Sequence, residues 1–381
     1  MEFLYETVYW VSLGVLVYTF LGYPALALLL GFRKRLIAAN PDYQPSVSLL
    51  VCAYNEESVI GQKIDNALST DYPEDRFEVV IVSDGSNDRT NEIVQQYDDS
   101  RLKFIAYPDR GGKAKALNTG IQYITGDVVV LTDANVVFQP DAIRKLVGVL
   151  NDDSLGCAVG NVVLRSDNGN IAPESLYSRY EEAIHKAEAN WQTMITVDGA
   201  MYALRREYMT PIPPDSLADD WYLASGVLGN HKHIAYVPEA VGFEYAAETV
   251  SGEFTRKVRM VAGGYQTAFR RSRLFFNPIL FPRVVFMFIS HKLLRWLAGI
   301  LMAVFYLANL TTLNTLWFQV TFAAQTSFYT LALGGWLFGG IRKPAILHIP
   351  YYFVAVNLAA ILGLWKYLTG GQKVTWERGR R

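Results

Sequence analysis

Residues 126–135, GDVVVLTDAN, decide the fold that we expect for this chain. The apolar run Val128 to Leu131 is bounded by polar residues, which is typical of a short strand covered on both faces. Asp133 follows at the carboxyl end of that strand, where ligands bind in open α/β sheets. Because Asp is also a common turn residue, this carboxylate alone identifies no site.

Two earlier stretches repeat the arrangement of an apolar strand followed by an acidic, polar end. They are VSLLVCAYNEE at 47–57 and FEVVIVSDGSND at 77–88. If the three strands lie in one sheet, their ends bring together the polar residues Asn55, Glu56, Asp84, Asp88 and Asp133. We therefore expect a site for a cation and a polar, phosphorylated ligand.

Strands and helices alternate from Pro45 to about Gly160. This alternation predicts an α/β fold with a Rossmann-like, doubly wound and mostly parallel sheet. A dinucleotide loop is excluded because residues 52–58, CAYNEES, contain no glycine. A nucleoside-triphosphate loop is excluded because residues 111–114, GGKA, lack both its spacing and its hydroxyl.

The distribution of apolar residues predicts a membrane protein. The chain has 381 residues and a formal net charge of -1, which predicts no nucleic-acid partner. Residues 7–32 carry no charge and are long enough to cross a hydrocarbon core of about 30 Å. We prefer a retained span to a cleaved signal peptide here, because no basic segment precedes it. Apart from His348, three later stretches are also free of charge, namely 296–313, 316–340 and 346–365.

Charges beside the first span predict its orientation. Residues 33–35, RKR, follow it, while Glu2 and Glu6 precede it. The positive-inside rule then places the central domain in the cytoplasm, at the plasma or inner membrane. Cys52 and Cys157 are therefore expected to be free thiols.

These segments give the expected domains. We expect an N-terminal transmembrane helix in 1–35, a cytoplasmic domain in 36–274, an interfacial amphipathic helix in 275–295, C-terminal transmembrane helices in 296–368 and a basic tail in 369–381. If 275–295 does not cross, three later spans leave the basic tail outside, against the charge rule. One late segment must therefore break the rule, re-enter, or pair with an interfacial stretch that does cross.

Five short motifs occur in a fixed order, and together they resemble a known family. They are CAYNEE (52–57), VSDGSND (82–88), GGKAKALN (111–118), LTDAN (131–135) and LADDW (217–221). The region from Val47 to Ala268 resembles family 2 glycosyltransferases with the GT-A fold. The similar branch is membrane-integrated and includes cellulose, chitin, hyaluronan and poly-N-acetylglucosamine synthases. The resemblance implies an inverting transferase that moves a sugar from a UDP-sugar to a membrane-associated glycan or a lipid-linked acceptor.

The resemblance also implies how the donor is bound. Tyr54 would cover the base, Glu56 would bind the ribose hydroxyls and Asp84 would bind the uracil edge. Lys113, at a helix start, would contact the diphosphate. Asp84 is alternatively the first residue of a plain turn. The lysines at the start of the helix, Lys113 and Lys115, are alternatively only solvated, and the role of Lys115 stays open.

Asp133 and Asn135 occupy the family's D-x-D position, which holds a divalent cation against the diphosphate. Mg²⁺ or Mn²⁺ prefers oxygen ligands, and phosphates and waters complete its shell. The second acid of the motif is absent here. The amide oxygen of Asn135 would take its place, directly or through water.

The catalytic base is expected in the D-D pair of residues 219–220. An inverting transfer needs a base for the acceptor hydroxyl, and the resemblance places it on Asp220, with Asp219 beside it. Asp219 is alternatively a helix cap, and Trp221 either stacks on an acceptor sugar or packs. Asp198 and Gly199 lie where relatives floor the acceptor and donor-sugar pocket, although a plain turn explains the glycine equally well.

Residues 256–260, RKVRM, stand where processive synthases carry Q-x-x-R-W. Arg256 and Arg259 are neighbours on a helix face and suit the departing diphosphate. A basic stripe on anionic lipid is the competing interpretation, to which we assign the later arginines. Met260 replaces the family's Trp, which favours a single-addition lipid glycosyltransferase, whereas the several C-terminal spans favour a processive synthase in polysaccharide biosynthesis. A third alternative is a non-catalytic nucleotide-sugar-binding scaffold.

Overall fold

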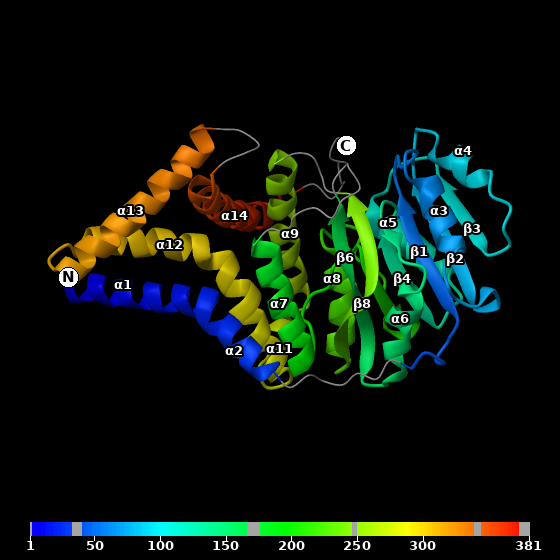
Figure 1. The fold of residues 1–381 in the computed structure, drawn as a ribbon, viewed down its shortest axis with the longest axis horizontal. Coiled ribbons are helices and arrows are strands. Elements are labelled where there is room, and N and C mark those ends of the chain that lie inside the picture. The colour runs from blue at the N-terminus through cyan, green and yellow to red at the C-terminus, as the bar shows by residue number, and fades with distance from the viewer. Residues whose placement is uncertain (1, 33–39, 166–175, 246–249, 339–343, 373–381) are drawn as a thin grey trace. The chain divides into compact units, whose positions relative to one another are not determined.

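The computed structural model describes the chain except for residues 1, 33–39, 166–175, 246–249, 339–343 and 373–381. The described chain divides into two compact units. The sheet unit consists of residues 27–248, and the helical unit consists of residues 1–26 and 249–372. Figure 1 labels the elements of both units.

A mixed sheet forms the centre of the sheet unit. Its order in the described residues is β3-β2-β1-β4-β7-β6-β8-β5. The strands are β1 Val47–Ala53, β2 Phe77–Asp84, β3 Leu102–Tyr107, β4 Val128–Asp133, β5 Val137–Phe138, β6 Leu155–Arg165, β7 Met201–Arg205 and β8 His233–Tyr245.

The first four strands in sequence are parallel, as the alternation predicts. In register, Cys52 of β1 lies opposite Val82 of β2 and Asp133 of β4. The carboxyl ends of β1, β2 and β4 therefore share one edge of the sheet. Beyond β4 the sheet is mixed, because β7 is antiparallel to both β4 and β6, and β5 is antiparallel to β8.

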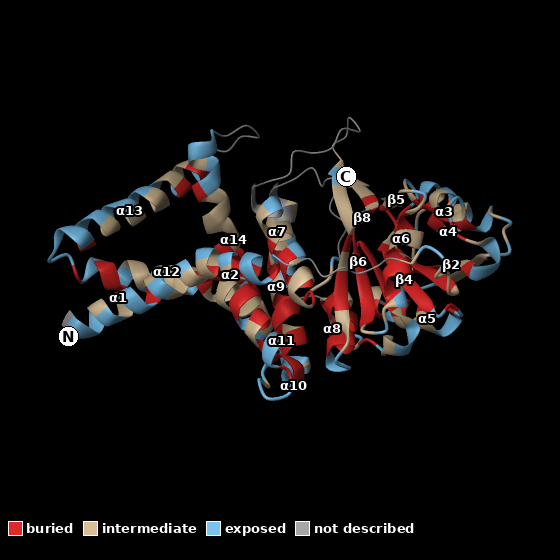
Figure 2. Cartoon of the chain, turned by 60° about the horizontal axis from the view of Figure 1, so that its bottom comes forward, coloured by how far each residue is buried: buried red, intermediate tan, exposed pale blue. Residues whose placement is uncertain are grey.

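The strands supply the buried core, and helices pack against them. Leu49, Val79 and Val130 are fully buried in one cluster. In Figure 2, β4 and the first half of β6 are buried. Ile60 and Ile64 join this cluster from one side of their helix. The helices of this unit are α3 Ile60–Leu68, α4 Thr90–Gln95, α5 Lys113–Tyr123, α6 Ala142–Gly148, α7 Leu176–Trp191 and α8 Asp219–Gly229.

The helical unit is built from helices, several of which are long and apolar. They are α1 Glu2–Val17, α9 Val250–Arg270, α10 Ser272–Phe275, α11 Pro282–Met287, α12 Leu294–Leu310, α13 Leu316–Leu337 and α14 Ala345–Leu368; α2 Tyr23–Leu30 crosses the boundary between the units. Among the described residues, three helical segments are long and apolar enough to cross a membrane: Phe3–Leu30, Pro282–Leu310 and Ala345–Leu368.

Two of the expected helix assignments differ from the structure. The stretch 275–295 does not form one separate helix, because a continuous helical segment begins at Pro282 and runs to Leu310. Proline is favoured at the first position of a helix, where its missing N–H costs nothing. The expected span 316–340 corresponds to α13, which is not one of the three candidate spans in the described chain. The polar side chains of Gln319 and Gln325 lower its hydropathy.

Polar and small residues join the helices of this unit. The Tyr9 hydroxyl of α1 donates to Thr321 Oγ1 of α13 at 3.0 Å. The Asn309 amide of α12 also bonds α13, because its Nδ2 donates to the Phe318 carbonyl at 3.1 Å and its Oδ1 accepts from Thr321 Oγ1 at 3.1 Å. Such side-chain bonds and close backbone approaches hold helices together in lipid. Large apolar side chains on the outside of the unit, such as Leu307 and Trp365, are more than 60% exposed, which suits an apolar solvent.

Candidate active site

Three acids and one lysine meet at the carboxyl edge of the parallel strands. Asp133 ends β4, Asp219 and Asp220 begin α8, and Lys113 begins α5. Lys113 Nζ lies 2.9 Å from Asp133 Oδ1 and 3.6 Å from Asp219 Oδ2. The predicted donor lysine, the first metal ligand and the acid pair are thus assembled in one cluster.

Burial and charge set the protonation of this cluster. Burial opposes the charged form of Lys113, but Asp133 and Asp219 outweigh it and raise its pKa well above the usual value. Burial, together with the neighbouring charge of Asp219, raises the pKa of Asp220 to about 7. A carboxylate with a pKa near neutrality is suited to act as a general base.

Asp84 fixes the loop that precedes Lys113. Its two carboxylate oxygens accept hydrogen bonds from the backbone N–H groups of Gly111 at 2.7 Å and Gly112 at 2.8 Å. The next residue, Gly85, has a φ of 69°, and a Cβ there would lie 2.5 Å from the Arg110 nitrogen. Glycine is therefore required at position 85, where the two loops approach each other closely. The predicted contact of Asp84 with the uracil edge stays a prediction, since both oxygens already hold this loop.

Tyr54 lies at the outer part of the same edge. The Arg110 guanidinium stacks over its ring at 3.8 Å from the centroid. Next to it, Asn55 Nδ2 donates to Asn87 Oδ1 at 2.8 Å, and the Asn87 backbone N–H donates to Asn55 Oδ1 at 2.9 Å. These two bonds join the loops that follow β1 and β2. The polar strand ends expected from sequence therefore contact one another.

Two predicted contact residues are buried instead. Glu56 is 2% exposed, and its backbone carbonyl accepts the N–H groups that start α3. Trp221 is 5% exposed, and its indole N–H donates to the Ile195 carbonyl at 2.6 Å. In this structure Trp221 packs, the second of the two roles that the sequence leaves open. The stacking of Trp221 on an acceptor and the ribose contact of Glu56 stay predictions.

The turn that contains Asp198 and Gly199 lies beside the acid pair. A Cβ on Gly199 would lie 2.6 Å from Asp220 Oδ2, so the Asp220 carboxylate packs directly against this glycine. Asp198 accepts the Ala200 N–H at 3.1 Å and closes the turn. A small cavity next to this turn is lined by Cys52, Lys113, Leu117, Thr132, Tyr202 and Asp219, among others.

Asn135 has a partner that sequence reasoning missed. Its Nδ2 donates to Glu244 Oε1 at 3.0 Å. Together with Asp133, these side chains supply only oxygen and amide groups, which are the ligand types that Mg²⁺ and Mn²⁺ prefer. The residues therefore fit a divalent cation of this kind. Glu244 lies next to the last residue of β8, as an acid near the end of a strand. The same pattern pointed to Asp133 in the sequence and could have pointed to Glu244.

Lys63 was also missed, because it lies in the middle of a helix pattern. It is 1% exposed and donates to the Val136 carbonyl at 2.7 Å and to Thr132 Oγ1 at 3.3 Å. Burial lowers its pKa to about 7, while Asp133 acts in the opposite direction. Lys63 therefore holds the turn that contains Asp133 through the residues on either side of it.

The predicted arginines lie in the other unit. Arg256 and Arg259 are both in α9, as their spacing predicts, with Arg256 exposed and Arg259 partly buried. Their assignment to the departing diphosphate stays a prediction.

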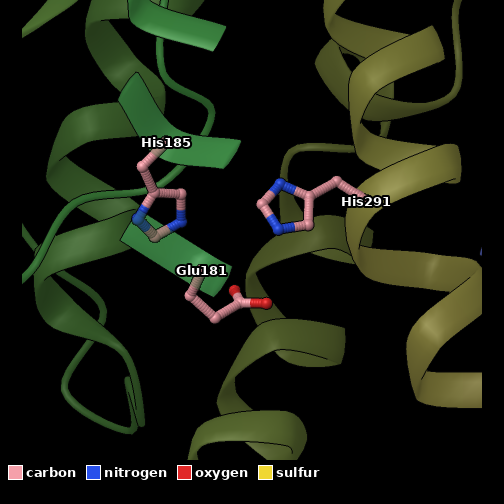
Figure 3. A group of neighbouring side chains, drawn as sticks. All are labelled: Glu181, His185 and His291. Atoms are coloured by element: carbon pink, nitrogen blue, oxygen red, sulfur yellow. The ribbon is translucent and has the colours of Figure 1, made fainter. Parts of the chain in front are cut away.

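Figure 3 shows two further titratable side chains, Glu181 and His185, which project from the same side of α7. They are one helical turn apart, as expected for an i, i+4 pair. His291, the third labelled side chain, belongs to the helical unit. None of the three was predicted as a site residue.

The family described as "Glycosyl transferase family 2" matches residues 48–209, which include β1 from its second residue and all of β2 to β7. These residues are a family 2 glycosyltransferase domain. The match ends before the acid pair at the start of α8. Asp133 and Lys113 therefore lie within the glycosyltransferase domain itself.

Curated relatives support the same assignment. The glycosyltransferase is 28% identical over 317 residues to "Probable glycosyltransferase YdaM" of Bacillus subtilis, an alignment that covers 74% of each chain. It is 24% identical over 276 residues to "Poly-beta-1,6-N-acetyl-D-glucosamine synthase" of Staphylococcus epidermidis, covering 70% of this chain and 65% of that protein. The alignment thus spans just under two thirds of the staphylococcal synthase.

A solved structure shares the fold. "Mannosyltransferase PcManGT from Pyrobaculum calidifontis in complex with GDP-Man and Mn2+" superposes with a TM-score of 0.76 at 23% identity, covering 97% of this chain and 99% of that one. The glycosyltransferase domain therefore has the expected GT-A fold.

Proposed function

We propose that this glycosyltransferase is a membrane-embedded, inverting enzyme that transfers a sugar from a UDP-sugar to a membrane-associated glycan or lipid-linked acceptor. The cluster of Lys113, Asp133, Asp219 and Asp220 is the observation that carries this proposal. The similarity of this chain to a poly-β-1,6-N-acetyl-D-glucosamine synthase supports a polysaccharide as the product.

The donor diphosphate would bind at the start of α5. Lys113 supplies a positive charge there, and the helix N-terminus adds N–H groups that favour phosphate. A divalent cation, Mg²⁺ or Mn²⁺, held by Asp133 and Asn135, would neutralise the charge of the diphosphate. Tyr54, stacked with Arg110, would provide a flat surface for the base.

Asp220 would remove the proton from the acceptor hydroxyl. The acceptor oxygen forms a bond to the anomeric carbon while the bond from that carbon to the diphosphate oxygen breaks, so UDP leaves with the electron pair. Asp219 raises the pKa of Asp220 and so improves it as a base. Arg256 and Arg259 would assist the departure of UDP by neutralising its charge.

The three candidate spans also support a topology. One span precedes the glycosyltransferase domain and two follow it, with α13 between them. If α13 does not cross, the C-terminal tail returns to the side of the glycosyltransferase domain. The basic residues at 33–35 and in 373–381 then share one side, which the positive-inside rule assigns to the cytoplasm of a plasma or inner membrane. A cysteine added at the C-terminus should resist a membrane-impermeant maleimide until cells are permeabilised; labelling of intact cells would contradict this topology.

The proposed activity can be tested on the purified full chain in lipid nanodiscs. UDP-glucose, UDP-N-acetylglucosamine, UDP-galactose and GDP-mannose would each be supplied with Mg²⁺ or Mn²⁺, and release of the nucleoside diphosphate measured. GDP-mannose is included because the structural relative was solved with it. We expect release from a UDP-sugar that depends on the cation and is lost in Asp220→Asn. Nucleotide-sugar binding without any release would favour the non-catalytic scaffold.

A single-addition lipid glycosyltransferase is the second candidate. Met260, at the position of the family's Trp, is 59% exposed and lacks the flat ring that stacks on a growing glycan. Product length separates the candidates, because a synthase yields a long ladder of products from labelled UDP-sugar and a single-addition enzyme yields one glycolipid.

A further inference from the structure

The amide of Asn135 is held by a residue more than 100 positions away in the sequence. Asn135 Nδ2 donates to Glu244 Oε1 at 3.0 Å, and Asn135 itself is 7% exposed. The antiparallel pairing of β5 with β8, in which Val137 lies opposite Phe243, brings Glu244 to this turn. The contact therefore follows from the sheet topology.

An amide side chain has two different ends, and a hard cation binds only the oxygen. A carboxylate only accepts hydrogen bonds, so it selects the Nδ2 end of Asn135 and turns the Oδ1 end away from itself. An aspartate needs no such orientation because its two oxygens are equivalent. An asparagine in this position does.

We propose that Glu244 is a positioning residue that orients the Asn135 amide so that Oδ1 is presented to the divalent cation at Asp133. This inference rests on the proposed function, because it assumes that Asp133 and Asn135 hold the cation. Hydrogen-bonding partners of this kind orient metal ligands in many proteins. Glu244 also keeps a second negative charge next to the turn, where the D-x-D motif would have its second acid.

Asn135→Asp would restore the family's second acid, but it would place two carboxylates in contact and remove the Nδ2 donor that now bonds Glu244. Like charges this close disfavour each other. Glu244→Gln would supply a donor to the carboxylate introduced at position 135, so the second change should rescue the first.

Direct measurement of metal binding tests the proposal without relying on turnover. Mn²⁺ binding to the purified full chain would be measured in the absence of UDP-sugar, by the electron paramagnetic resonance of free Mn²⁺. We expect Glu244→Leu to weaken binding by about 10- to 100-fold. Glu244→Gln should remain close to the native chain, because its amide oxygen still accepts from Asn135. Asn135→Asp should bind more weakly than the double variant with Glu244→Gln.

Controls separate this inference from the proposed function and from misfolding. Glu239 is an exposed acid on the same strand, and Glu239→Leu should leave Mn²⁺ binding unchanged. Thermal melting would check that Glu244→Leu is folded; should it fail to fold, the comparison of Asn135→Asp with the double variant decides. The orientation role is overturned by equal losses in Glu244→Gln and Glu244→Leu, by no loss in either, or by Asn135→Asp binding more tightly than the double variant. If the native chain binds no Mn²⁺, or Asp133→Ala does not weaken binding, the proposed metal site itself fails.

Discussion

Lys113 Nζ lies 2.9 Å from Asp133 Oδ1 and also approaches the acid pair at Asp219. Asp133 ends a strand, and Lys113 begins the helix that immediately precedes that strand in sequence. One ammonium therefore joins the proposed cation site to Asp219, the neighbour of the proposed base Asp220. The first prediction tests whether this ammonium is required.

Lys113→Met should lower kcat/KM by about 10²- to 10³-fold, because a charge aimed at the diphosphate is lost from a partly buried site. Lys115 is the matched control. It is exposed on the same helix, and its ammonium lies 4.9 Å from the Tyr107 ring centroid. Lys115→Met should leave kcat/KM little changed in a UDP-release assay. Equal losses in the two variants would show that general loop charge, and not the Lys113 position, is what matters.

Asp220 predicts the dependence of activity on pH. A base must be deprotonated, and the pKa of Asp220 is raised to about 7, so kcat/KM should rise with pH and level off above about 7. Asp220→Asn should lower turnover by about 10²- to 10⁴-fold while UDP binding persists. The measurement is kcat/KM between pH 5 and 9, with UDP binding by calorimetry. A profile that is flat across this range would contradict the assignment of the base.

The same group predicts a dependence of stability on pH. Below the unfolded pKa, near 4, Asp220 is neutral in both states and costs nothing. As the pH rises from about 4 to 7, the unfolded chain ionises while the folded one resists, so Asp220 progressively destabilises the native enzyme. Asp220→Asn should therefore raise Tm more at pH 8 than at pH 4. A Tm difference that does not grow with pH would argue that Asp220 is not held neutral in the fold.

Two asparagines make the same double contact with backbone at different places. Asn118 bonds both the N–H and the carbonyl of Ile212 at 2.8 Å, and so fixes the loop before α8. Asn66 bonds both backbone groups of Phe138 at 2.8 Å and fixes β5, just beyond Asn135. Each pair of hydrogen bonds joins a helix to a segment of the candidate site.

Replacing each asparagine with alanine should give different losses. Asn118→Ala should lower kcat more than Mn²⁺ affinity, because it loosens the loop that positions Asp220. Asn66→Ala should weaken Mn²⁺ binding more. Each variant should also lose about 1–3 kcal/mol of stability, since buried backbone groups lose their partners. If kcat and Mn²⁺ affinity fall in the same proportion in both variants, the two asparagines do not have the separate roles predicted here.

Adjacent glycines of α13 provide a prediction for the helical unit. A Cβ on Gly335 would lie 2.6 Å from the Leu347 carbonyl of α14, whereas a Cβ on Gly334 would come no closer than 3.7 Å to Leu347. Gly335→Ala should therefore lower stability by about 1–3 kcal/mol through overpacking, seen as a lower Tm in nanodiscs. Gly334→Ala should be neutral or slightly stabilising, because alanine favours helix. An equal effect of both would argue against close packing of α13 on α14.

Sequence pattern predicted the edge of the sheet where the site lies. Parallel strands that end in polar residues place those residues together, so Asp84 and Asp133 were found without tertiary information. The start of α5 at Lys113 was predicted by its loop. The burial of Glu56 was not, because nothing in its local pattern distinguishes a side chain that points into the fold from one that points out of it.

The sequence by itself determined the order of strands and helices, the apolar helices and the position of the acids along the chain, because these depend on local periodicity. Only the tertiary structure decided which side chains contact each other. The contact of Lys113 with Asp219 and the contact of Asn135 with Glu244 each join positions more than 100 residues apart. They depend on the antiparallel half of the sheet, whose pairing is set by packing across the whole domain and not by any local pattern.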